Sequence, residues 1–144
     1  MEINITGTDS MVNMFNELVS RQRHLRIPLQ RTGDYLQKSF RREYKTKGGG
    51  KWAPLAPSTV KQKARMGYPP GRPLIATGRM YRATKMIRIG SDYVDTGVEN
   101  IEYYKYHHWR TRYMPARKVV KIWRRTISKI RAIWETWLLR RISK

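Results

Sequence analysis

Apolar residues recur at the three- and four-residue spacing of an amphipathic helix in two runs near the start of the chain. The first run follows Asp9 and Ser10, either of which is suited to cap a helix that extends to about residue 24. The second begins near Pro28 and ends at the glycine triplet of residues 48–50, with Gly33 as a local weak point. We therefore predict a helical hairpin. The apolar face of its second helix consists of Leu29, Tyr35, Leu36, Phe40 and Tyr44.

The middle of the chain, residues 48–73, is rich in glycine and proline, which predicts a long irregular region. One short helix is expected within it, capped by Ser58 or Thr59 and ending near Met66. Another short helix is expected over residues 77–83, with the threonine at its first position as the cap.

Two short segments then alternate apolar and polar residues, which is the period of a β-strand. Residues 85–90 and 92–98 flank a Gly-Ser-Asp turn and predict an antiparallel hairpin. Because both strands are short, we expect more sheet or a neighbouring subunit to stabilise them.

The most regular pattern lies at the C-terminal end, where a helix of about seven turns is predicted from Arg117 to Lys144. One side of this helix carries an apolar stripe, and the other faces are basic, with Glu135 as the single acid. The stripe consists of Val120, Trp123, Ile127, Ile130, Trp134 and Trp137, and Arg141 follows at the same spacing.

These elements predict an α+β fold: an N-terminal helical hairpin, a small antiparallel β-sheet, short helices in a Pro/Gly-rich middle, and a long basic C-terminal helix. The length of 144 residues fits one domain. We expect residues 1–116 to form its α+β body and residues 117–144 to extend the same domain as a basic amphipathic helix.

The charge of the chain is strongly positive, with 31 lysines and arginines against 10 acids and a formal net charge of +21. Between Tyr44 and Ser91 there are 11 cations and no acid. The excess favours contact with nucleic acid, although a cationic surface without a specific partner is an alternative. The segregation of the charges favours opposed electrostatic faces, which suit head-to-tail contacts between subunits.

Residues that could support catalysis are sparse. The absence of cysteine excludes a disulfide, a thiolate zinc site and a cysteine nucleophile. His107 and His108 are adjacent and point in different directions on any regular element, which is unsuited to a metal or a catalytic pair. We expect no enzymatic activity, no cofactor and no metal, and no apolar run is long enough to predict a membrane span.

Aromatic side chains and the cations beside them are the remaining candidates for binding. Pro54 and Pro57 stiffen a segment that presents Trp52 and Leu55 as apolar pegs, and residues 103–110 form a dense aromatic cluster. Such residues stack on bases, anchor a protein partner, or simply pack in a core. The candidate subunit or partner interface consists of Trp52, Leu55, Tyr103, Tyr104, His107, Trp109, Trp123, Ile127, Trp134 and Trp137. The candidate DNA-facing cations are Lys61, Lys63, Arg65, Arg117, Lys121, Arg124 and Arg125.

Five short motifs occur in a recognisable order: KWAPL at 51–55, ST with a lysine at 58–61, LIATGRM at 74–80, an aromatic-histidine segment at 103–108, and MPAR at 114–117. In this order they resemble the bacteriophage virion morphogenesis family, which includes the tail-completion and Mu-like G proteins. The resemblance covers about residues 28–120. The chain departs from the family pattern after the first tyrosine of the aromatic segment, where a small residue is usual, and after its histidines, where a glycine is usual.

The resemblance implies a structural protein of the virion neck, which completes the head-proximal end of the tail and joins the tail to the head. Similar proteins form rings, often six-fold. The implied partners are copies of this chain in a hexameric ring, adjoining neck or connector proteins, tail-terminator or tail-tube proteins, and genomic double-stranded DNA held by charge without sequence readout. The implied location is the virion neck, and the host cytoplasm during assembly.

Two other functions fit the composition. A free, sequence-nonspecific nucleic-acid-binding protein would carry the same charge, but no known nucleic-acid-binding motif is present in the sequence. A membrane-active protein is a weaker alternative that rests on residues 117–144 alone.

Overall fold

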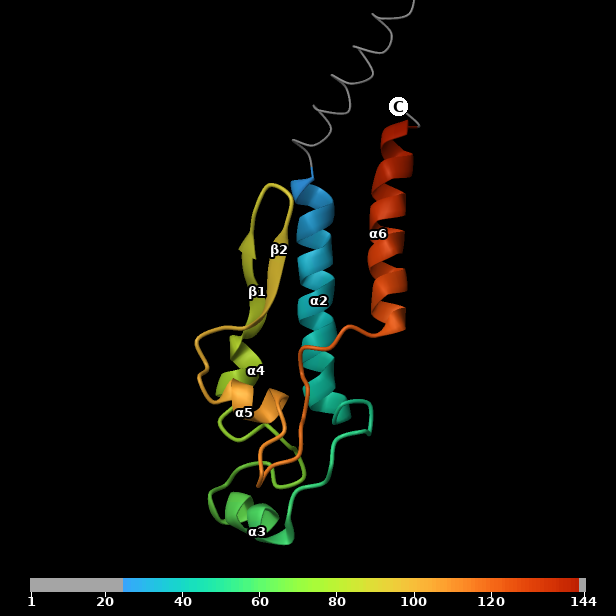
Figure 1. Ribbon diagram of the computed structural model, residues 1–144. Coiled ribbons are helices and arrows are strands. Elements are labelled where there is room, and N and C mark those ends of the chain that lie inside the picture. Colours follow the sequence, from blue (N-terminus) through green and yellow to red (C-terminus); the bar gives the residue numbers. More distant parts are fainter. Residues whose placement is uncertain (1–24, 143–144) are drawn as a thin grey trace, which may run out of the picture.

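The computed structural model describes residues 25–142, which form five helices and one β-hairpin in an α+β arrangement, the class that the sequence predicted (Figure 1). The elements in chain order are α2 (Arg26–Thr46), α3 (Pro57–Arg65), α4 (Arg79–Ala83), β1 (Thr84–Ile89), β2 (Val94–Val98), α5 (Tyr104–His108) and α6 (Arg124–Ile142). The helix expected from Asp9 or Ser10 lies outside the described residues, so the helical hairpin stays a prediction.

The long helix α2 is the central element of the fold. The β1–β2 hairpin packs along one side of α2 and α6 packs along the other, so α2 contacts both (Figure 1). The short helices α3, α4 and α5 and the loops between them lie toward the C-terminal end of α2 (Figure 1). One end of the molecule is therefore built from regular elements, and the other mainly from irregular segments.

Helix α2 follows the predicted apolar pattern closely. Leu29, Phe40 and Tyr44 are buried, and their spacing places them on one face of the helix. The helix ends at Thr46 because Lys47 adopts a left-handed conformation with φ 52°, and its backbone N–H donates to the carbonyl of Glu43. The glycines that follow continue with positive φ, so the predicted stop at the glycine triplet is confirmed within two residues.

A small core forms around Tyr44, which packs with the buried residues Phe40, Met80 and Val119. Its hydroxyl lies 2.9 Å from Thr84 Oγ1 and 3.3 Å from the carbonyl oxygen of Met80. Burial raises the pKa of Tyr44 to about 12, so the phenol stays protonated at neutral pH. The core therefore joins α2, α4, the start of β1 and the strand-like segment before α6.

The β-hairpin appears where the sequence predicted it, with Thr84 opposite Val98 and Ile89 opposite Val94. A bulge between Met86 and Arg88 shifts the register within the pair. Helix α2 supplies the support that two short strands need: Arg41 Nε donates to the carbonyl of Thr84 at 2.9 Å, and Gln37 Oε1 accepts from the backbone N–H of Met86 at 2.9 Å. No further strand is present in the described part of the chain.

The expected caps of the two short helices need correction. Helix α3 begins at Pro57, so neither Ser58 nor Thr59 caps it. Proline suits the first helical position because its fixed φ is helical and its missing N–H would have no partner there. Helix α4 begins at Arg79 after Gly78, although the hydroxyl of Thr77 still accepts from the backbone N–H of Arg79 at 3.3 Å.

The start of the C-terminal helix was predicted wrongly. Helix α6 begins at Arg124 rather than Arg117. Burial alternates along the preceding segment, where Arg117 and Val119 are buried and Lys118 is exposed, which is the pattern of extended chain rather than helix. The core around Tyr44 takes up Val119, and this tertiary contact overrides the helical spacing of the sequence.

Gly33 lies where the hairpin packs most closely on α2, so a substitution there tests that packing. A Cβ atom at this position would overlap Met86 Sδ and lie 2.8 Å from Val94 Cγ2, so glycine permits the close approach rather than weakening the helix. We expect Gly33→Ala to lower the free energy of unfolding by about 1–2 kcal/mol, because overpacking outweighs the gain in helix propensity. Urea unfolding measures this effect, with Lys38→Ala on the exposed face of α2 as control. A stabilised Gly33→Ala variant would contradict the packing.

Candidate functional site

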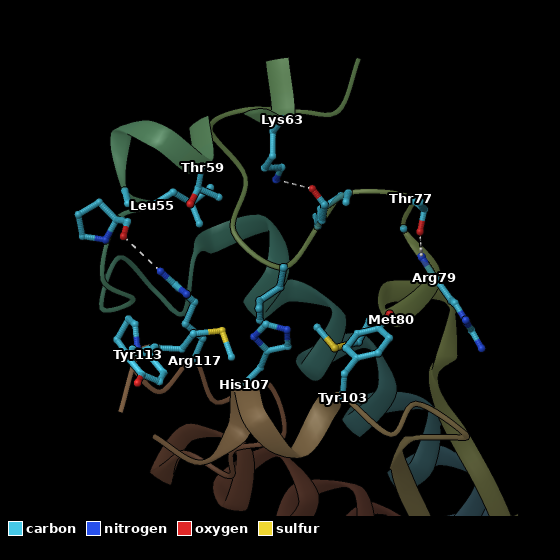
Figure 2. Close-up of a pocket in the computed structure, with 18 of the residues that line it drawn as sticks. Leu55, Thr59, Lys63, Thr77, Arg79, Met80, Tyr103, His107, Tyr113 and Arg117 are labelled. Atoms are coloured by element: carbon cyan, nitrogen blue, oxygen red, sulfur yellow. Dashed lines mark hydrogen bonds between the residues drawn. The ribbon is translucent and has the colours of Figure 1, made fainter. Parts of the chain in front are cut away.

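Three irregular segments and two helices meet around one hollow of about 730 Å³, which we call the motif pocket (Figure 2). Its walls come from residues 54–59, 74–80 and 113–117, from α5, and from Lys63 of α3. Each of the five sequence motifs contributes to these walls, although the motifs are spread over more than sixty residues. The volume is within the range of about 300–1,000 Å³ found for ligand pockets.

Arg117 connects two walls of the motif pocket. Its side chain is only 6% exposed, and its guanidinium donates to the carbonyl of Ala53 at 3.0 Å and to that of Pro54 at 3.2 Å. Its backbone N–H donates to the carbonyl of His107 at 2.7 Å. The expectation that Arg117 faces DNA is therefore wrong, because its donors are used to hold the proline-rich segment against α5.

Lys63 has a similar role on the opposite wall. Its side chain is 9% exposed, and its Nζ donates to the carbonyls of Arg72 at 2.5 Å and Ile75 at 2.6 Å. Burial lowers the pKa of this lysine. Lys63 is therefore not a DNA-facing cation either, since it organises the loop before α4. Its neighbours Lys61 and Arg65 are exposed on α3, and their contact with DNA stays a prediction.

The two histidines of α5 occupy different environments. His107 lines the motif pocket, and its Nδ1 has no hydrogen-bond partner within residues 25–142. Burial and then the nearby Arg117 lower the pKa of His107. His108 Nδ1 lies 2.7 Å from the hydroxyl of Tyr104, and burial and then Lys118 lower the pKa of His108. Both rings therefore favour the neutral form.

The chemistry of the motif pocket is that of an apolar hollow edged by fixed cations. Leu55, Met80 and Tyr103 contribute apolar or aromatic surface, and Figure 2 shows them around the same space as His107 and Arg117. No carboxylate of residues 25–142 lines this hollow. The arrangement is suited to holding an apolar side chain.

Several predicted interface residues are instead used inside the chain. Trp52 is half-buried, meets the ring of Tyr44 edge-on at a centroid distance of 6.3 Å, and fills the space beside Gly48. Trp134 Nε1 donates to Thr32 Oγ1 of α2 at 3.2 Å, and Trp137 is buried in the described fold. These three tryptophans stabilise the fold of the chain itself.

The other predicted interface residues divide by exposure. Tyr104 packs against the core, whereas Tyr103, Trp109 and Ile127 are exposed. Ile127 lies beside the seam between α6 and α2 rather than in it, because Thr126 takes the buried position. An interface role for the exposed residues stays a prediction.

Three of the predicted cations gather at the start of α6. Lys121 Nζ lies 3.9 Å from the ring centroid of Trp123, and Arg124 and Arg125 are exposed in the first turn of the helix. A fourth cation, Lys51, joins them although it was not among the predicted DNA-facing residues, and its Nζ lies 4.7 Å from the same centroid. No sequence spacing signals this contact, since the two residues are far apart in the chain and only the fold brings them together.

Comparison of the chain with models of protein families, with curated proteins and with solved structures found no match. Among residues 25–142, no helix is long and apolar enough to cross a membrane. The same residues contain no group of three or more histidines and acids placed to hold a metal ion. Inferences about function therefore depend on the chain's own sequence and geometry.

Replacing Arg117 tests whether its hydrogen bonds hold the walls of the motif pocket together. We expect Arg117→Ala to lower the free energy of unfolding by about 2–4 kcal/mol, because the carbonyls of Ala53 and Pro54 lose their charged donor and a gap replaces the buried side chain. The adjacent Lys118→Ala is the matched control. Lys118 is exposed and its Nζ lies 5.6 Å from the ring centroid of Trp109, so the change in stability should stay below about 1 kcal/mol. Equal effects in urea unfolding would contradict the role of Arg117.

The histidines of α5 predict a pH dependence of stability. Their folded pKa values lie below the ordinary value of 6.5, so the unfolded chain binds more protons as the pH falls below 6.5. Their contribution is complete above that pH and is lost as the pH falls through the folded pKa values. Unfolding from pH 7.5 to 5 should show this loss, and His107→Gln should reduce it. An unchanged profile in a variant with both histidines replaced by glutamine would contradict it.

Proposed function

We propose that this protein is a non-catalytic structural subunit of the neck of a tailed bacteriophage virion. It completes the head-proximal end of the tail and joins the tail to the head as a hexameric ring around the DNA channel. The observation that carries the proposal is the motif pocket: all five motifs of the resemblance contribute to one three-dimensional unit. A chance succession of similar short motifs has no reason to converge in this way.

An exposed apolar flank of α6 supports subunit association. Ile127 is 51% exposed and Leu138 is 46% exposed, and they lie about three turns apart on the same side of the helix. The half-buried Trp134 continues this apolar surface from the seam with α2 outward. A helix that is packed on one side and apolar on the adjoining flank is suited to contact a second copy of the chain.

The charge distribution supports contact with DNA. In the part of the chain that the structure describes there is one ion pair, in which Lys85 Nζ lies 2.6 Å from Glu99 Oε2. Most of the cations therefore have no acidic partner in this part of the subunit. Their mutual repulsion is relieved by a polyanion, and a ring with cations toward its channel would neutralise phosphate without reading sequence.

The second candidate function is a free, sequence-nonspecific nucleic-acid-binding protein. The same unpaired cations favour it, so DNA binding by itself does not distinguish the two candidates. They differ in assembly, because a neck protein forms a closed oligomer and is present in the finished particle, and a free binding protein requires neither.

Assembly of the full-length protein tests the proposal. Sedimentation and native mass spectrometry should give a closed oligomer, and mass spectrometry of purified virions should detect the protein. We expect Leu138→Glu to raise the concentration needed for assembly at least tenfold, about 1.4 kcal/mol, because it places a charge in the apolar contact. Met66→Glu, on an exposed apolar residue of the loop after α3, is the control. A wild-type protein that stays monomeric at high concentration and is missing from particles would overturn the proposal.

A further inference from the structure

We infer that the cations gathered around Trp123 form the surface on which this protein holds the phosphate backbone of duplex DNA. This surface, the Trp123 cluster, consists of Lys51, Lys121, Arg124 and Arg125 around the indole. The inference rests on the proposed contact with genomic DNA and assigns that contact to particular residues.

Three separate segments bring the four cations together. Lys51 follows the glycine turn after α2, Lys121 belongs to the extended segment before α6, and the two arginines occupy the first turn of α6. Both lysine ammonium groups lie over the ring of Trp123, at 4.7 Å and 3.9 Å from its centroid. Cation–π attraction offsets part of their mutual repulsion and restricts where the two charges lie.

The Trp123 cluster borders a hollow of about 510 Å³. Lys51, Arg124 and Arg125 line it, together with the glycine turn and Glu43. Glu43 is the single acid in this lining and is only 2% exposed, so it offsets one charge of the four without covering the cations. All four cations are exposed, and none forms an ion pair with an acid of residues 25–142.

Arg124 and Arg125 lie at the N-terminal end of α6, where their charges are repelled by the helix dipole. The N-terminal end of a helix is its positive end, where acids are normally favoured, and the first turn of α6 contains none. Arg124 and Arg125 stand there instead. An anion bound between the four side chains would interact favourably with the cations and with the helix end. The positive end of the helix adds to the attraction that the four cationic side chains exert on an anion, and those side chains alone define the surface.

The geometry favours the backbone of a duplex over a single strand. Binding of single strands depends on aromatic faces that are free to stack on bases. Trp123 is half-buried and has two ammonium groups over its ring, so its face is used within the protein. Lysine and arginine bind phosphates of a duplex without any contact to bases. Ile122 is exposed beside the cluster, so anionic lipid is the competing partner that the experiment must include.

Salt-dependent binding of the full-length protein to a 30-base-pair duplex tests the inference. Fluorescence anisotropy over a range of NaCl concentrations gives the slope of log K against log salt, to which each phosphate contact contributes about −0.9. Arg124→Gln/Arg125→Gln and Lys51→Gln/Lys121→Gln should each make the slope shallower by about 1.8 and weaken binding about tenfold or more at 0.1 M NaCl. Arg31→Gln/Lys38→Gln removes two exposed charges from α2 and is the matched control, expected to change the slope by less than about 0.5.

The outcomes separate the two proposals. Wild-type protein that binds duplex while the cluster variants, folded by circular dichroism, keep its slope would overturn this inference alone. An equal loss in the α2 control would also overturn it, because the charge would then act diffusely. Tighter binding to a single strand, or binding to phosphatidylserine vesicles but not to duplex, would overturn it in favour of another partner. The neck assignment is decided independently by the oligomeric state and the virion composition.

Discussion

The buried side chain of Tyr44 holds the separate segments of the fold together. Its ring lies at the C-terminal end of α2, completely enclosed, where the rings of Trp52 and Tyr81 meet it edge-on. Enclosing a side chain of this size contributes about 2–3 kcal/mol. Its hydroxyl is satisfied by Thr84 Oγ1, which ties the start of the hairpin to the helix. Because several segments converge on one ring, the irregular half of the molecule acquires a defined position relative to the regular half.

Two buried cations continue this organisation where regular secondary structure is lacking. Four loop carbonyls around the motif pocket accept hydrogen bonds from these two buried side chains. Arg117 supplies donors to Ala53 and Pro54, and Lys63 supplies them to Arg72 and Ile75. Each cation loses hydration on burial, and the hydrogen bonds to carbonyls offset that loss. Two long side chains thereby shape a pocket whose walls are mostly irregular chain.

The proposed functions occupy different parts of the same helix. One side of α6 packs on α2, where Trp134 donates to Thr32, and the adjoining flank exposes Ile127 and Leu138, which we propose to contact another copy. Its N-terminal end carries the cations around Trp123. Self-association and DNA contact would therefore not compete for the same surface. This separation suits a subunit that is part of an assembly and meets a polyanion at the same time.

The α+β class, the helix α2, the hairpin and the existence of a basic C-terminal helix could all be predicted from the sequence, because apolar periodicity is a local property that these elements retain in the fold. The five short motifs and their order along the chain are also visible in the sequence. The inward direction of Arg117 and Lys63 could not be predicted in this way, since it depends on which distant carbonyls the fold brings within reach of each cation. Val119 packs in the core around Tyr44, and α6 therefore begins only at Arg124. The fold also brings Lys51 close to Trp123. These are contacts between residues distant in the chain, and their energies do not appear in any local pattern.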